Sequence, residues 1–82
     1  MSRRRVTWGQ AERYFNRHEF EIRSSGGDKI IIAPRHDSRR RSRPQVRIGH
    51  KYCSRRGDEL SWGYLSVIKN AFGVTADDIL NE

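Results

Sequence analysis

The stretch from residue 20 to residue 33 constrains the fold more than any other part of the chain. Residues 20–23 alternate between apolar and polar side chains, and residues 29–33 are mostly β-branched. Both patterns are typical of β-strands. Between them, residues 24–28 contain the pair Gly26 and Gly27, and glycine adopts positive φ angles at little cost. The sequence therefore predicts two strands joined by a turn, the second of which ends at Pro34.

Helical patterns lie on either side of this hairpin. Thr7 and Gln10 have the spacing of a capping box, and apolar or aromatic side chains follow at helical intervals up to His18. We therefore expect a helix over residues 7–18. A second helix is expected to begin after Ser61 and to end at Gly73, and Thr75 is a suitable cap for a short last helix.

A third strand is expected over residues 45–50, where Val46 and Ile48 share one face. The predicted order is then α-β-β-β-α followed by a short helix. This order predicts an α+β fold in which one face of a three-stranded antiparallel sheet carries the helices, as in double-stranded-RNA-binding domains. With 82 residues the chain is long enough for one domain only, which we place at residues 7–82. Residues 1–6 are expected to form a basic tail, and residues 35–44 a flexible arginine-rich loop.

Several classes of protein are excluded by composition. No apolar run is long enough to span a membrane, and no apolar segment follows the basic residues at the N-terminus as a secretory signal requires. Cys53 is the only cysteine, which excludes an intrachain disulfide and a cysteine-rich zinc site and fits a reducing cytoplasm. Neither a metal nor a cofactor is expected.

The charge is strongly basic and unevenly distributed. Lys and Arg number 17 against 10 Asp and Glu, for a net charge of +7, and the basic residues concentrate between Lys29 and Arg56. Such a stripe is typical of nucleic-acid binding, whereas a solvated charged surface is the alternative. A basic face for an acidic protein partner is a further possibility. DNA binding is less favoured because the helices lack helix-turn-helix spacing.

Three segments together resemble the HicA toxins, which are small mRNA interferases of bacterial toxin–antitoxin pairs. The first is the helix-to-strand passage at residues 14–22, and the second is the glycine turn and strand at residues 26–34. The third is a strand ending in His50, followed by Glu59-Leu60 and then by residues 63–74, which read GYLSVIKNAFGV. The resemblance covers roughly residues 7–80.

This resemblance implies a dsRBD-like fold, an RNA substrate, metal-independent endoribonuclease activity and neutralisation by a HicB-like antitoxin. In the family, the catalytic histidine lies in a Gly-Ser-His turn at the start of the second strand. Here the turn reads Gly26-Gly27-Asp28, so that Asp28 occupies the histidine position and Lys29 follows it. The resemblance therefore implies either a toxin with altered catalytic residues or a homologue that binds RNA without cutting it.

Three residues are candidates for the chemistry. Asp28 is either a general base or simply the residue that closes the turn. Lys29 is a candidate phosphate clamp. His50 is either a general acid or base, a phosphate contact, or an ordinary strand-end histidine, because an imidazole exchanges protons near neutral pH.

The candidate RNA-binding residues follow the basic stripe. They are Arg35, His36, Arg39, Arg40, Arg41, Arg43, Arg47, Lys51 and Tyr52. Arg55 and Arg56, next to Cys53, are expected to lower the pKa of its thiol.

Overall fold

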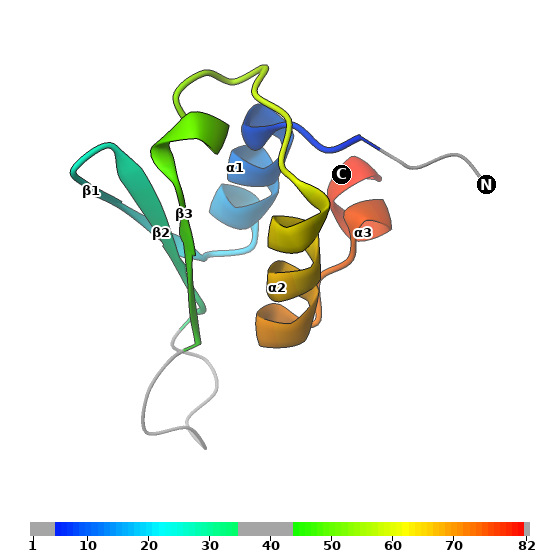
Figure 1. The fold of residues 1–82 in the computed structure, drawn as a ribbon. Helices are drawn as coiled ribbons and strands as arrows, with labels where there is room; N and C mark the ends of the chain where they lie inside the picture. Colours follow the sequence, from blue (N-terminus) through cyan, green and yellow to red (C-terminus); the bar gives the residue numbers. More distant parts are fainter. Residues whose placement is uncertain (1–4, 35–43, 82) are drawn as a thin grey trace.

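A computed structural model describes residues 5–34 and 44–81 of the chain (Figure 1). Its elements are α1 (Trp8–Arg17), β1 (Glu21–Ser25), β2 (Asp28–Ile32), β3 (Gln45–Ile48), the 3₁₀-helix η1 (His50–Tyr52), α2 (Trp62–Phe72) and α3 (Ala76–Leu80). The strands form one antiparallel sheet in the order β1-β2-β3, and the helices gather on one side of it (Figure 1). The predicted α+β fold and order of elements are confirmed.

The hairpin between β1 and β2 is tighter than expected. Ser25 pairs with Asp28, which leaves only Gly26 and Gly27 in the loop. Both glycines have positive φ, at 58° and 92°, as a two-residue turn that matches the twist of its strands requires. Residues 24, 25 and 28, predicted as turn, therefore belong to the strands.

Helix α1 begins and ends with local hydrogen bonds. Thr7 and Gln10 form the predicted capping box, in which each side chain binds the backbone N–H of the other residue. At the other end, the N–H of Phe20 donates to the carbonyl of Phe15 over 2.9 Å, and Glu19 has a φ of 66°. This is a Schellman ending in which glutamate occupies the left-handed position that glycine usually fills.

The core lies between the sheet and the helices. Phe15 of α1, Ile31 of β2 and Ile48 of β3 are fully buried, and Ile68 of α2 is 1% exposed. The rings of Phe20 and Phe72 pack on Phe15 with centroids 4.8 and 5.7 Å away. This packing joins α1, the sheet and α2 into one body.

The segment from residue 49 to residue 60 differs from the prediction. β3 ends at Ile48 rather than at His50, and His50 begins the 3₁₀-helix η1. The chain then returns to the start of α1, where the N–H of Trp8 donates to the carbonyl of Asp58 over 2.7 Å and that of Gly9 to the carbonyl of Arg56 over 2.9 Å. These carbonyls satisfy N–H groups that a helix cannot satisfy by itself.

No helix within residues 5–34 and 44–81 is both long and apolar enough to cross a membrane.

Candidate functional site

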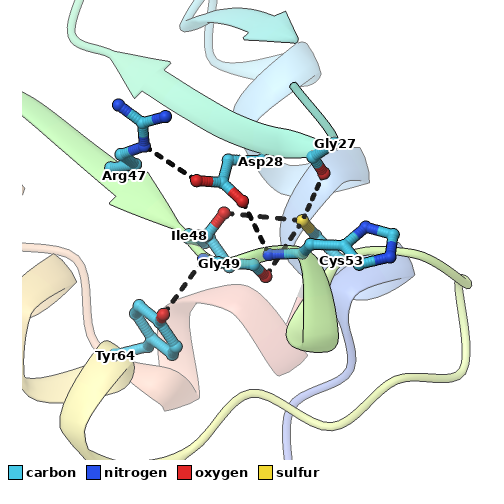
Figure 2. A network of polar contacts seen from close by, with 8 residues as sticks. Gly27, Asp28, Arg47, Ile48, Gly49, Cys53 and Tyr64 are labelled. Carbon is cyan, nitrogen blue, oxygen red and sulfur yellow. Dashed lines mark hydrogen bonds and ion pairs between the residues drawn. The ribbon is translucent and has the colours of Figure 1, made fainter. Parts of the chain in front are cut away.

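The glycine turn and the end of β3 meet at one end of the sheet. Lys29 of β2 is opposite Ile48 of β3, so that Asp28 reaches the backbone where β3 passes into η1. One oxygen of the Asp28 carboxylate, Oδ1, accepts the backbone N–H of His50 over 2.9 Å. The other, Oδ2, accepts Nε of Arg47 over 2.9 Å (Figure 2). Asp28 therefore joins the hairpin to both sides of the β3–η1 junction.

These two contacts also set the charge of Asp28. The hydrogen bond from Arg47, followed by that from the His50 backbone, lowers the pKa of the carboxyl below its ordinary 3.8. A carboxylate with a lowered pKa remains ionised and is a weak proton acceptor at neutral pH. The geometry fits the turn-closing interpretation of Asp28 better than the general-base interpretation.

The imidazole of His50 lies against the glycine turn. A Cβ atom added to Gly27 would lie 3.0 Å from Nδ1 of His50 and 3.4 Å from its Cγ. Oγ of Ser54 lies 3.1 Å from the same Nδ1 and donates to the His50 carbonyl over 2.5 Å. We call Gly27, Asp28 and Ser54 together the His50 seat. His50 itself is an exposed residue.

Cys53 is buried next to the His50 seat. Its Sγ is 3.7 Å from the carbonyl oxygen of Gly27, 3.6 Å from that of Ile48 and 3.3 Å from that of Gly49 (Figure 2). Burial raises the pKa of the thiol, against a smaller lowering by a hydrogen bond from the Lys29 backbone. The lowered pKa expected from the neighbouring arginines is therefore wrong, because a buried thiolate would be poorly solvated.

A tyrosine pair supports the junction from the other side. The N–H of Gly49 donates to the Tyr64 hydroxyl over 3.0 Å, and a Cβ at Gly49 would lie only 2.9 Å from that oxygen (Figure 2). The ring of Tyr52, half-buried, packs edge-on against Tyr64 with centroids 5.0 Å apart. The structure thus gives Tyr52 a packing contact in addition to its predicted place at RNA.

Lys29 does not join Asp28 in one site. Successive side chains of a strand point to opposite faces of the sheet. Lys29 shares the face of the buried Ile31, and its Nζ donates to Oγ of Ser24 over 2.7 Å, whereas Asp28 and Arg47 share the other face. The structure therefore brings together Asp28, Arg47 and His50, and not Asp28 and Lys29.

The remaining predicted RNA contacts divide into two groups. Arg47 and Lys51 are exposed beside His50, on β3 and η1. The others, Arg35, His36, Arg39, Arg40, Arg41 and Arg43, lie outside the described residues.

Sequence reasoning missed Gly27 and Ser54 as neighbours of His50. The spacing of Ser54, four residues after His50, is the one local signal, since such a serine can reach back across a helical turn. The contact with Gly27 spans two strands and has no local signal. In the part of the chain that the structure describes, no three His, Cys, Asp or Glu side chains gather as a metal site would need.

Comparisons with protein-family models, with curated proteins and with solved structures found no match for this chain.

Proposed function

We propose that this protein is a HicA-like, metal-independent endoribonuclease in which His50 is the acid–base group. The observation that carries the proposal is the seat of this histidine. Its backbone is held by a carboxylate, its ring lies against a residue without a side chain, and the residue is exposed. A histidine fixed in this way on a basic protein is suited to exchange protons with bound RNA.

The two departures from the Gly-Ser-His turn support this proposal. Gly27 and Asp28, the residues that differ from the family pattern, are both contacts of His50. A serine at position 27 would bring a Cβ against the imidazole, and a histidine at position 28 would remove the carboxylate that holds the His50 N–H. In this proposal the imidazole comes from the start of η1, beside the position where the family places it.

The chemistry needs one group that both accepts and donates a proton. His50 accepts the proton of a ribose 2′-hydroxyl as the 2′-oxygen forms a bond to the adjacent phosphorus. The bond from phosphorus to the 5′-oxygen then breaks, and the 5′-oxygen takes the proton from the imidazolium. The products are a 2′,3′-cyclic phosphate and a 5′-hydroxyl. Arg47 and Lys51 supply positive charge next to this position.

A HicB-like antitoxin and a cytoplasmic location belong to the same proposal and rest on the resemblance alone. The second candidate function, RNA binding without cleavage, is favoured by the one observation that the family's histidine position holds an ionised aspartate.

Induced expression in bacteria tests the proposal, with growth and total mRNA integrity as readouts. We expect growth arrest and mRNA loss from the wild-type chain. His50→Ala should abolish both, because loss of a general acid–base group typically costs about 10²–10⁴ in rate. His18→Ala is the matched control, since His18 is also exposed but stacks on Tyr14 at the end of α1.

The purified chain, incubated with RNA in the presence of a chelator, gives the direct measurement. Cyclic phosphate ends that require His50 would support the proposal. Intact RNA together with salt-dependent RNA binding would replace it with the binding function. Equal cleavage by wild type and His50→Ala would remove His50 from the mechanism.

A further inference from the structure

A second basic feature lies along α1, and its lining includes neither His50 nor the residues of the His50 seat. A depression of about 640 Å³ runs between this helix and the turn at Arg56 and Gly57. Its charged lining residues are Arg13 and Arg17 of α1, Arg56 of the turn, and one acid, Glu12. We call this depression the α1 groove.

Gly9 permits the groove to form. A Cβ at Gly9 would lie 3.0 Å from both Cβ and the carbonyl oxygen of Arg56, and the Gly9 N–H donates to that carbonyl. The turn therefore lies directly on the helix and places Arg56 beside it. Because the N–H groups of Trp8 and Gly9 bind protein carbonyls, side chains rather than the helix terminus would meet a ligand here.

Two charges of the groove, those of Arg13 and Arg17, lie close together on α1. Arg13 and Arg17 are one helical turn apart on the same side of α1, where like charges weaken a helix. Glu12 lies 3.8 Å from Arg56, so that the lining carries three guanidinium groups and one carboxylate. The core contacts of α1 come from Trp8, Ala11 and Phe15 on the opposite side of the helix.

The lining also indicates the class of ligand. All nine lining residues are glycine, polar or charged: Thr7, Gly9, Gln10, Glu12, Arg13, Asn16, Arg17, Arg56 and Gly57. Protein interfaces depend on apolar and aromatic anchors at their centre, and this groove offers none. Guanidinium groups, in contrast, match the geometry of phosphate oxygens.

We infer that the α1 groove binds phosphates of the RNA backbone, as an attachment point separate from the His50 seat. This inference rests on the proposed RNA binding but not on cleavage. It deepens that proposal by assigning RNA contacts to Arg13, Arg17 and Arg56, which lie outside the predicted RNA-binding set.

Salt-dependent RNA binding by the full chain tests the inference. The probe is a duplex RNA of about 16 base pairs, the length that a dsRBD spans, together with one of its single strands. All measurements use the His50→Ala background, so that cleavage cannot alter the probe. The variant is Arg13→Gln with Arg17→Gln. Its matched control is Arg23→Gln with Lys69→Gln, which removes two exposed positive charges from β1 and α2.

We expect the groove variant to bind more weakly. The slope of its log binding constant against log salt concentration, the salt slope, should be smaller in magnitude by about 1.4–1.8, since each phosphate contact contributes about 0.7–0.9. The control should keep the wild-type slope, and Arg13→Lys with Arg17→Lys should keep most of it because the charges remain. Glu12→Gln should tighten binding, because it removes the acid that offsets Arg56.

The outcomes separate the two proposals. If the parent chain binds neither probe, the proposed RNA function fails. If the parent binds and the groove variant has the same slope, the α1 groove is not an RNA site. An equal loss of slope in the control would also overturn the inference, because total charge rather than this groove would then set affinity.

Discussion

Gly27→Ala should displace the imidazole of His50, and Gly26→Ala should not. Both glycines have positive φ, and an L-residue in that region costs roughly 1–2 kcal/mol. They differ in their surroundings, because a Cβ at Gly27 meets Nδ1 of His50 at 3.0 Å whereas a Cβ at Gly26 has nothing within 4 Å. The exposed histidine ring can turn away, so that the clash changes its position more than the stability of the fold.

Both variants place alanine at a positive φ, with the larger backbone cost at Gly27, whose φ of 92° lies outside the left-handed region of L-residues. They can still be compared in the folded state. A domain of 82 residues is stable by about 4–12 kcal/mol, so either variant remains folded. Each should lower the melting temperature by roughly 5–15 °C, since about 4–8 °C corresponds to each kcal/mol in a domain of this size. Circular dichroism measures this loss.

The decisive assay is the chemical shift of the His50 ring in NMR spectra, recorded together with RNA cleavage. Gly27→Ala should move the ring resonances and reduce cleavage, and Gly26→Ala should leave both close to wild type. Unmoved His50 resonances in Gly27→Ala would refute the contact between Gly27 and the His50 ring. Equal shifts in the two variants would show that the ring responds to the turn as a whole and not to one added methyl group.

Three further outcomes follow from the structure. Asp28→Asn should destabilise the protein at neutral pH, because a carboxyl whose pKa Arg47 lowers stabilises the fold only while it is ionised. In acid-unfolding curves the difference from wild type should shrink as the pH falls below the ordinary 3.8 and through the lowered pKa of Asp28; a difference that persists in strong acid would contradict this. Cys53 should react with iodoacetamide far more slowly in the native protein than in denaturant, since burial raises its pKa and hides its sulfur; equal rates would disprove its burial. Glu19→Gly should raise the free energy of unfolding by about 1 kcal/mol, because glycine relieves the positive φ after α1; a loss of stability in denaturant titrations would show that the glutamate side chain contributes more than the backbone strain costs.

The helix caps could be predicted because they are local. Thr7, Ser61 and Thr75 each cap the helix that follows through a hydrogen bond three residues along the chain. The turn at Gly26 and Gly27 is equally local, and its exact length depended only on which residues pair across it. Such features follow from short stretches of sequence.

The candidate site could be predicted only in part. Asp28, Arg47 and His50 were identified one by one, from the family position, the basic stripe and the strand end. Their association depends on register, since the Asp28–His50 hydrogen bond joins residues 22 apart. A slip of one residue in pairing would have sent the Asp28 side chain to the helix side instead.

The alternation of side chains along β2 separates Asp28 from Lys29. The two residues are adjacent in the sequence, but successive side chains of a strand point to opposite faces of the sheet. The 3₁₀-helix at His50 had no such signal. It lies where the chain turns from β3 toward α1, so that its position depends on the tertiary structure rather than on a local pattern.

The contacts between the start of α1 and residues 56–60 have a consequence for the order of events during synthesis. The ribosome makes the helix and the hairpin first, yet Trp8 and Gly9 find their acceptors only when Arg56 and Asp58 have emerged. The bond from Leu60 to Val6 closes the same long loop. Such non-local closure is slow relative to helix and hairpin formation. A nascent chain that stops before residue 56 therefore lacks the second wall of the α1 groove, and a chain that stops before residue 50 lacks the imidazole, so both sites are completed late in translation.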